Sequence, residues 1–137
     1  MEEFEIIRAT VEDEQTLCEM FLKHITAHPE YISHGEIQMG VGEGEFEDGV
    51  LVARPSARAR ECWMRYIHGD MTADDAAVFK AVSTTGDIIG FTVAEIQEDG
   101  AEPFGMVCDV LVDESLRCGG VGTALLQSAL GWFKEMG

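Results

Sequence analysis

Basic residues are scarce in this chain. The sequence holds 9 Lys and Arg against 26 Asp and Glu, which gives a formal net charge of -17. A surplus of this size repels the phosphates of DNA and RNA and the anionic surface of a membrane. We therefore expect neither nucleic acid nor membrane among its partners. The same field would concentrate cationic small amines or basic peptide segments near the surface.

Long apolar runs and paired cysteines are also missing. No apolar stretch approaches the roughly 18 residues that a transmembrane helix needs. The start, Met1-Glu2-Glu3, lacks the positive charge that opens a signal peptide. The cysteines form no CxxC pair and no dense disulfide framework, and they are Cys18, Cys62, Cys108 and Cys118. We expect a soluble protein of the reducing cytoplasm.

The length of 137 residues suits one compact domain with one core, and no repeat or linker divides it, so we expect residues 1–137 to form a single domain. The alternation of Phe4 to Arg8 predicts a first strand. Thr10, with Asp13 three residues later, predicts a helix start, and Leu17, Phe21 and Ile25 share its buried face up to Pro29.

The middle of the chain contains a glycine-rich stretch and a second helix. Five glycines stand among acidic residues from His34 to Pro55, which predicts a mobile loop. Ser56 can cap a second helix that runs to about His68, with an apolar stripe at Ala59, Trp63, Tyr66 and Ile67.

The second half of the sequence predicts three strands and a final helix. Val78 to Ser83 and Ile88 to Ile96 flank Thr84-Thr85-Gly86-Asp87, a spacing typical of a hairpin. Met106 to Val112 is largely apolar and predicts a central strand. In the final helix, Val121, Leu125 and Ala129 share one flank, and a neighbouring flank adds Leu126, Leu130 and Phe133.

The turn before the last helix carries the chemistry that is easiest to interpret. Arg117-Cys118-Gly119-Gly120-Val121-Gly122-Thr123 lies where a buried strand gives way to a helix. Amides at a helix start lack intrahelical acceptors, and glycines let a diphosphate approach the backbone. Arg117 could add a cation and Thr123 a hydroxyl donor. The alternative is that the glycines only relieve crowding between helix and sheet.

This segment resembles the acetyl-CoA-binding segment of the GNAT superfamily of N-acetyltransferases. The family fingerprint, Q/R-x-x-G-x-G/A after a strand with an apolar-x-Val end, matches Val110 to Gly122. Gly86-Asp87-Ile88-Ile89-Gly90-Phe91 and Ile7-Arg8-Ala9-Thr10 also resemble family elements. The resemblance implies an α/β (α+β) fold with a mixed, mainly antiparallel sheet flanked by helices, in the order strand, two helices, three strands and a helix.

The resemblance also implies roles for single residues. The backbone of Val110, Leu111 and Val112 would pair with the pantetheine arm of acetyl-CoA. The pyrophosphate would be held by the segment Arg117, Cys118, Gly119, Gly120, Val121, Gly122 and Thr123. The implied activity is direct transfer of an acetyl group to a small-molecule or peptide amine, without a metal.

Direct transfer needs a base that takes a proton from the amine. Four acids could serve as this base. They are Asp109 on the apolar strand and Glu95, Glu98 and Glu102 near the expected substrate edge. We take Asp109 and Glu102 as the catalytic candidates. Strand alternation predicts that Cys108 and Asp109 face opposite sides, so at most one of them faces the cleft. For each residue the alternative is a purely structural role, a hydrogen-bonded carboxylate at 109 and a core thiol at 108.

Similar enzymes continue beyond the last helix with a strand, a helix and usually a final strand, which have no counterpart here. The missing helix often carries a tyrosine acid, and the only tyrosines here are Tyr31 and Tyr66. The edge of the Met106 to Val112 strand would then be bare, so we expect a homodimer that covers it, or a product truncated from a longer acetyltransferase.

The sequence also contains two weaker patterns, one of histidines and one of arginines, and it is compatible with two other functions. His24, His28, His34 and Glu30 resemble metal ligands only loosely, and we expect surface or capping roles. The arginines at 54, 58, 60 and 65 suit a solvated helix face better than a CoA phosphate site. The other functions are a non-catalytic acyl-CoA-binding module and an unrelated α/β domain whose glycine loop serves packing.

Overall fold

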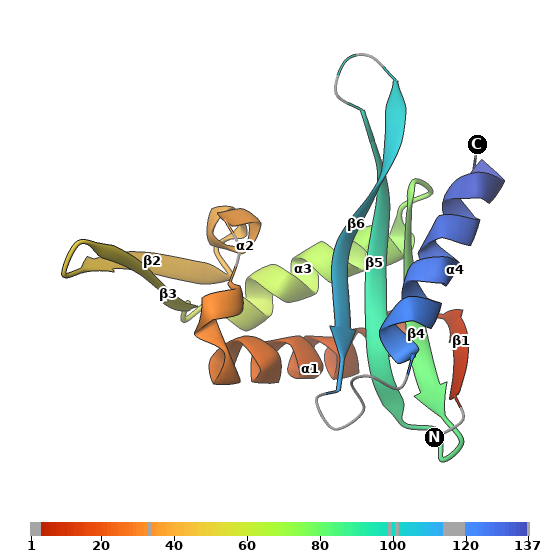
Figure 1. Cartoon of the computed structure of the whole chain (residues 1–137), viewed down its shortest axis with the longest axis horizontal. Coiled ribbons are helices and arrows are strands. Elements are labelled where there is room, and N and C mark those ends of the chain that lie inside the picture. Colours follow the sequence, from red (N-terminus) through yellow and green to blue (C-terminus); the bar gives the residue numbers. More distant parts are fainter. Residues whose placement is uncertain (1–3, 33, 99, 101, 114–119, 137) are drawn as a thin grey trace. The chain divides into compact units, whose positions relative to one another are not determined.

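The computed structural model describes residues 4–32, 34–98, 100, 102–113 and 120–136. The chain divides into two compact units (Figure 1). The first unit combines Met1–Asp13 with Gly69–Gly137, and the second is Glu14–His68. Within the described ranges, no helix is both long enough and apolar enough to cross a membrane.

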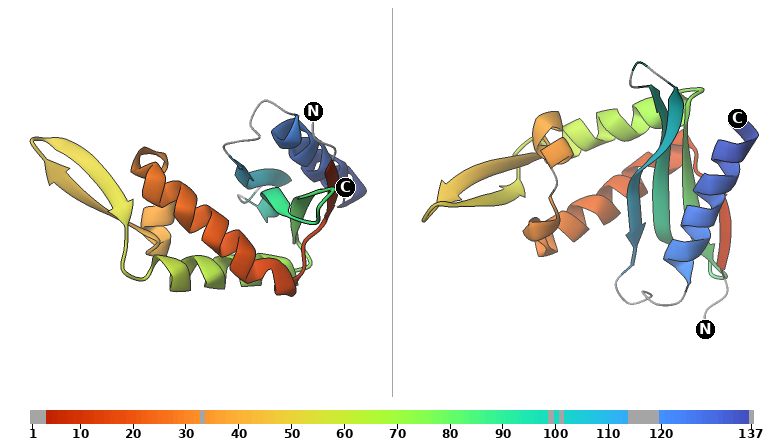
Figure 2. Two further views of the ribbon diagram at one scale, coloured as in Figure 1. Left: turned by 90° about the horizontal axis from the view of Figure 1, so that it is seen from below. Right: turned by 45° about the horizontal axis from the view of Figure 1, so that its top comes forward.

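The first unit is built on a four-stranded sheet with a helix on one face. Its strands are β1 (Phe4–Arg8), β4 (Ala76–Ser83), β5 (Ile88–Glu98) and β6 (Pro103–Val112), in the spatial order β1-β4-β5-β6. Every neighbouring pair is antiparallel. Helix α4 (Val121–Met136) crosses one face of the sheet, as both views in Figure 2 show. The expected strand at Phe4 to Arg8 and the expected hairpin of β4 and β5 are confirmed.

The core of this unit lies between α4 and the sheet. Val121, Leu125, Ala129 and Trp132 are buried at helical spacing, and they pack over small and apolar sheet residues, Ala77, Ala81, Ile89 and Ala94. Alanines let the helix approach the strands closely because they add little bulk. The predicted flank of Val121, Leu125 and Ala129 is confirmed.

The second predicted flank of α4 is only partly buried. Phe133 packs against the core, whereas Leu126 and Leu130 keep 40% and 55% of their surface exposed. The prediction of a broader buried face is therefore wrong at these two leucines. They lie beyond the stripe of α4 that meets the sheet.

Strand β6 lies at the edge of the sheet of described residues, so the predicted central position is wrong. Its apolar composition had suggested burial on both faces. Phe104, Met106 and Val110 instead keep about two-fifths of their surface exposed, at 41%, 44% and 40%. The strand is also longer than predicted, since it begins at Pro103.

A β-bulge interrupts the pairing of β5 with β6. Val93 is opposite Asp109 and the next residue, Ala94, is opposite Val107, which leaves Cys108 as the extra residue on β6. Val107 and Val112 both pack on the α4 side although they are five residues apart. Strict alternation would place them on opposite faces. The bulge therefore resets the side-chain pattern of β6.

The second unit contains α1 (Glu14–Ala27), α2 (His34–Met39), a two-stranded sheet of β2 (Gly42–Glu47) and β3 (Val50–Pro55), and the first part of α3 (Ala59–Thr72). Leu17, Phe21 and Ile25 are buried as predicted. Trp63 is fully buried and stacks on Phe21 with ring centroids 4.8 Å apart. These contacts make the aromatic centre of the unit.

The stretch from His34 to Pro55 is a short helix and a hairpin, so the predicted mobile loop is wrong. The turn between β2 and β3 has positive φ at both central residues, 51° at Asp48 and 81° at Gly49. Asp-Gly supplies these angles at low cost and is typical of a tight hairpin turn. The count of glycines obscured this signal in the sequence.

The predicted helix starts are correct in kind. Asp13 Oδ2 accepts a hydrogen bond from the Thr10 N–H at 2.9 Å, in a single 3₁₀ turn just before α1. Ser56 Oγ accepts one from the Arg58 N–H at 3.2 Å before α3. Helix α3 then continues to Thr72, past the predicted end near His68. Its last turn belongs to the first unit.

We predict that Gly105→Ala destabilises the protein by about 1–3 kcal/mol, because a Cβ at this position would lie 2.7 Å from the Phe133 ring. The matched control is Gly131→Ala on the exposed side of α4, where a Cβ meets nothing within 4 Å. It should leave stability unchanged or raise it by up to about 1 kcal/mol, because alanine favours helix. Urea unfolding of the three proteins measures both effects. Equal stabilities for the two variants would contradict the close packing of Phe133 on β6.

Candidate functional site

The end of β6 and the start of α4 lie side by side. A Cβ at Gly122 would be 3.7 Å from Val112 Cγ2, and the Ala124 N–H donates to the Gly120 carbonyl at 3.0 Å. Gly120 is therefore the residue that caps α4. The amides of Val121, Gly122 and Thr123 follow in the first turn, where a helix supplies no acceptor of its own. Together with the helix dipole, they form a place where an anion is stabilised.

The backbone at Gly120 requires glycine. Its φ is +85°, in the left-handed region, and a Cβ there would meet no atom of the described residues within 4 Å. The glycine thus serves the turn, and none of the described side chains covers it. A diphosphate could approach the first turn of α4 without meeting a side chain at this position.

A second glycine sets the distance between the helix and the sheet. A Cβ at Gly90 would lie 2.8 Å from the Leu111 carbonyl oxygen and 3.3 Å from side-chain atoms of Leu125 and Val121. Gly90 pairs with Val112, and the Asp113 N–H donates to the Ile89 carbonyl at 2.9 Å. These contacts fix the start of α4 directly on the strand ends.

The structure places seven of the ten residues predicted to bind the cofactor. Val110, Leu111 and Val112 are the last three residues of β6. Leu111 is buried and Val110 is exposed. Gly120, Val121, Gly122 and Thr123 surround the helix start. The predictions for Arg117, Cys118 and Gly119 lie outside the described residues.

A pair of carboxyl groups lies on the sheet face away from α4. Asp70, in the last turn of α3, meets Glu95 on β5. Asp70 Oδ2 is buried, and no N–H or O–H donor of the described residues reaches it. Contact with a second carboxyl group is favourable only if one of the two carries a proton. The geometry therefore indicates a single proton shared by Asp70 and Glu95.

The electrostatics of the pair agree with this protonation. Burial raises the pKa of Asp70 to about 8, and the hydrogen bond with Glu95 and the charges of Glu95, Asp109 and Asp75 add to the rise. The pKa of Glu95 is lowered, chiefly by the hydrogen bond from Asp70 and also by Gln97 and Cys108, against the effect of burial. Gln97 Nε2 donates to Glu95 Oε1 at 2.9 Å. At neutral pH Asp70 is the donor and Glu95 the anion.

The bulge brings Cys108 and Asp109 to the same carboxyl pair. The Cys108 thiol hydrogen-bonds Glu95, and the charge of Asp109 acts on Asp70. Thr92 Oγ1, fully buried, donates to the Asp109 backbone carbonyl at 2.7 Å and anchors the strand there. The prediction that these two neighbours act on opposite sides of the sheet is wrong. The extra residue of the bulge cancels the alternation at this point.

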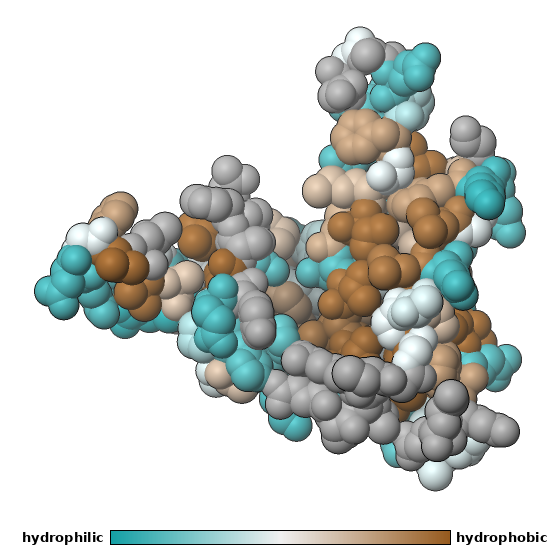
Figure 3. All heavy atoms as spheres, in the orientation of Figure 1, coloured by the Kyte–Doolittle hydropathy of each residue, from teal (hydrophilic) through white to brown (hydrophobic). Residues whose placement is uncertain are grey.

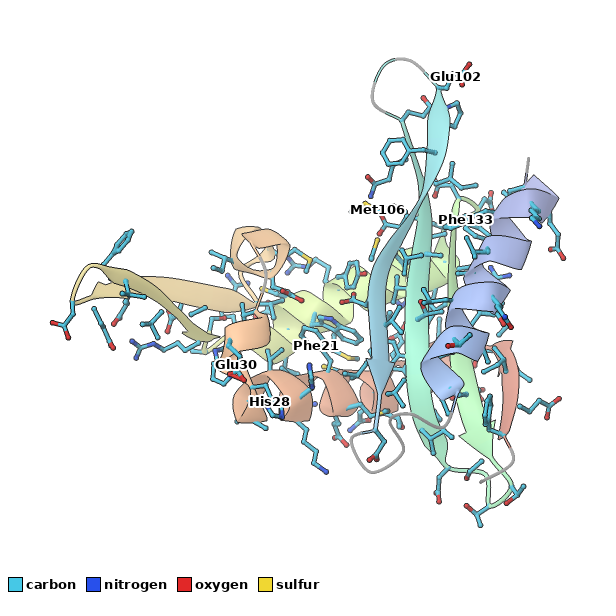
Figure 4. All side chains as sticks on the ribbon, viewed as in Figure 1. Phe21, His28, Glu30, Glu102, Met106 and Phe133 are labelled. Atoms are coloured by element: carbon cyan, nitrogen blue, oxygen red, sulfur yellow. The ribbon has the colours of Figure 1, made fainter. Side chains whose placement is uncertain are left out.

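The two predicted catalytic acids are far apart. Glu102 is exposed and lies at the far end of the β5–β6 hairpin, well away from Met106 (Figure 4). Asp109 lies further along β6, opposite Val93. Seven residues of extended chain separate them by roughly 23 Å. Only Asp109 belongs to the group that contains Asp70 and Glu95.

Comparison with known families decides the classification. Residues 46–137 match the model of the acetyltransferase (GNAT) family. The chain belongs to this family. The match includes the β5–β6 hairpin, the turn and α4, and therefore the whole strand-to-helix site described above.

Solved structures support the GNAT fold. Glucosamine-6-phosphate N-acetyltransferase from Arabidopsis thaliana is similar with a TM-score of 0.63 at 18% identity, over 99% of this chain and 78% of that one. Aminoglycoside N-acetyltransferase AAC(6')-Iy, in complex with CoA, gives 0.62 at 17%, over 100% and 73%. A glucosamine N-acetyltransferase region in a fungal multi-domain β-N-acetylglucosaminidase gives 0.62 at 18%, over 100% of this chain and 13% of that protein. A comparison with curated proteins finds no match.

Asp70 is the member of the carboxyl pair that the sequence analysis missed. A signal was present, because Asp70 continues the stripe of Ala59, Trp63 and Ile67 at helical spacing. An acid on an apolar stripe needs a buried partner. The predicted helix ended near His68, so the stripe was not followed far enough.

The four arginines and the histidine group of the sequence analysis have local partners. Arg54, Arg58, Arg60 and Arg65 form ion pairs, with Glu45, Glu61, Glu19 and Glu61 respectively. All are exposed, as expected of a solvated face. His28 Nδ1 is 3.2 Å from Glu30 Oε1. Over the described part of the chain, no group of three His, Cys, Asp or Glu side chains is arranged to hold a metal ion.

We predict that the protein loses stability as the pH rises from 6 to 9, and that Asp70→Asn loses less. The folded pKa of Asp70 is raised, so its favourable contribution is complete below the unfolded value near 3.8 and disappears as the pH passes about 8. Melting temperatures at pH 6 and 9 should differ between the two proteins by about 3 °C or more, the effect of about 1 kcal/mol. Asp74→Asn, an exposed neighbour, is the control and should behave as the wild type. An equal loss in all three proteins would contradict the shared proton.

Proposed function

We propose that this GNAT protein is an N-acetyltransferase that transfers an acetyl group from acetyl-CoA directly to an amine. The observation that carries the proposal is the junction of β6 with α4. There, no side chain of the described residues covers Gly120, and the amides of the first helical turn have no acceptor within the helix. The family match across residues 46–137 supports the same conclusion. The reaction needs no metal ion in this proposal.

The cofactor would follow the strand end into the helix start. Val110, Leu111 and Val112 lie on β6, which has no neighbour on its outer side among the described strands, so its outer backbone groups could pair with a pantetheine arm. The pyrophosphate would meet the amides of Gly120 to Thr123, and Arg117, Cys118 and Gly119 would complete that loop. Main-chain donors suit this task because their direction is fixed by the helix.

The acceptor would be a cationic amine, either a small molecule or a basic peptide. A formal charge of -17 attracts cations to the protein and repels phosphorylated acceptors. Among the similar structures, one aminoglycoside acetyltransferase was solved with the aminoglycoside sisomicin. An aminoglycoside is therefore a suitable first probe.

The proton of the amine would pass to an acid near the thioester. Asp109 and Glu102 are the candidates that we propose from the sequence. Of these two, Asp109 lies nearer the proposed thioester position, because it is on β6 next to the proposed pantetheine strand and its charge acts on the carboxyl pair. Glu102 stays a prediction for an acceptor that reaches the end of the hairpin.

The site would work in a cytoplasmic homodimer. Cys18, Cys62 and Cys108 are thiols and not disulfides, which suits a reducing compartment. Figure 3 shows apolar side chains gathered over β6 and α4, where Phe104, Met106, Val110, Leu126 and Leu130 are exposed. An open strand edge beside an apolar surface favours pairing with a second copy.

We predict that CoA and acetyl-CoA raise the melting temperature of the wild type and that Gly120→Glu abolishes the increase. The new carboxylate would occupy the open space and repel the diphosphate. The matched control is Gly49→Glu in the β2–β3 turn, where φ is +81° and a Cβ also meets nothing within 4 Å. It carries the same strain and charge and should keep the increase. At a ligand concentration 100 times Kd the stabilisation is about 2.7 kcal/mol.

Thiol release with a panel of amines then separates an enzyme from a non-catalytic acyl-CoA-binding module. Binding without thiol release from any amine would favour the module. No thermal shift with any CoA ester, in the wild type, would contradict the proposed function altogether.

We predict that light scattering after size exclusion gives the mass of a dimer and that Phe104→Glu shifts it toward a monomer. Phe104 lies on the edge strand, and a glutamate there would place like charges opposite each other in the dimer. Phe46→Glu, on the other hairpin at 78% exposure, is the control and should leave the mass unchanged. Dissociation by Phe46→Glu alone would place the contact on β2 and β3 instead.

A further inference from the structure

The carboxyl pair holds a proton close to the place where the proposed reaction would occur. Glu95 is opposite Met106 and Asp109 is opposite Val93, so both acids lie on the sheet face away from α4. If pantetheine follows β6 from Val112 to Val110, the next residues in its path are Asp109 and Cys108. Each residue advances the strand by roughly 3.3 Å. The thioester would then arrive at the bulge, where Cys108 contacts Glu95.

We propose that the carboxyl pair of Asp70 and Glu95 takes the proton of the acceptor amine, with Glu95 as the group that receives it and Asp70 as the positioning residue that shares it. The inference rests on the proposed acetyl transfer and names a residue pair for it. Asp70 comes from α3 and Glu95 from β5. The Asp70 carboxyl group hydrogen-bonds Glu95, and its buried Oδ2 has no hydrogen-bond partner among the described residues. The β-bulge at Cys108 interrupts the β5–β6 pairing next to the Ala94–Val107 pair, one residue along β5 from Glu95.

The chemistry follows from the charge of the pair. With one proton, Asp70 donates to Glu95 and the pair is a weak base. Without it, two adjacent carboxylates repel each other, and the pair regains a proton readily, with a pKa of about 8 that is set by burial and by Asp109 and Asp75. A base in this range is well matched to an ammonium group. The Gln97 amide and the Cys108 thiol also face the pair, and both hydrogen-bond Glu95.

Atoms and charges balance in the resulting step. The acceptor ammonium gives one proton to the Glu95 carboxylate, and Asp70 shares it. The nitrogen lone pair attacks the thioester carbonyl carbon, a C–N bond forms and the C–S bond breaks. The thiolate leaves with the C–S electron pair and takes the second nitrogen proton, which gives the amide and CoA thiol. The carboxyl pair then releases its proton to water.

The test measures kcat/KM by thiol release from pH 6 to pH 10, with sisomicin and a basic peptide as acceptors. In the wild type, the rate should rise to a plateau above a pKa near 8. Glu95→Gln should lower the rate about 10²-fold at every pH. Asp70→Asn should remove the rise of kcat/KM near pH 8, because the asparagine amide donates a hydrogen bond to Glu95 at every pH. The acceptor's own titration is the same in every variant, so a difference between profiles belongs to the protein.

The exposed acid variant Asp74→Asn is the control and should keep the wild-type profile. If Asp70→Asn keeps the rise of kcat/KM near pH 8, with CoA binding and thiol release intact, this inference is overturned and the proposed function stands. CoA binding without thiol release from either acceptor would overturn both. If Asp70→Asn does not fold, carbon-detected NMR titration of the wild-type carboxyl groups replaces it. Titration of both groups below pH 6 would overturn the inference.

Discussion

Backbone pairing between β5 and β6 holds the two halves of the candidate site in place. The ladder runs from Gly90 opposite Val112 to Glu98 opposite Pro103, with one interruption at Cys108. One end of it meets the start of α4, where an anion can be bound. The middle carries the bulge and the carboxyl pair. A change in register by one residue would exchange the two faces and separate these groups.

The two halves of the candidate site, the anion site and the carboxyl pair, depend on different kinds of interaction. The anion site depends on main-chain amides and on the left-handed backbone at Gly120, so it tolerates many side chains but few changes of conformation. The carboxyl pair depends on two half-buried side chains and one proton, so it tolerates changes of backbone detail but not the loss of either acid. This difference suits a family in which a shared cofactor meets varied acceptors.

Much of the sheet and the start of the last helix at Val121 could be predicted from the sequence, and the cofactor role of that helix start stays a prediction. Strands with β-branched residues and helices with four-residue spacing, such as Leu17, Phe21 and Ile25, leave a local pattern that survives folding. The Asp48-Gly49 turn was readable too, but five glycines in that region outweighed it. Bulges leave no such pattern, because Cys108 becomes the extra residue only when β5 and β6 pair. The partnership of Asp70 with Glu95 is equally a product of tertiary structure.

Gly90 has a consequence for how variants of the cofactor site would behave. Its missing side chain lets α4 lie close over β5, because a Cβ there would be 3.3 Å from side-chain atoms of Val121 and Leu125 and 2.8 Å from the Leu111 carbonyl oxygen. Any larger residue would lift the helix start and tilt its amides, although it would touch no ligand atom. Weak cofactor affinity in such a protein would reflect a displaced scaffold, and restoring contacts at the ligand itself would not repair it.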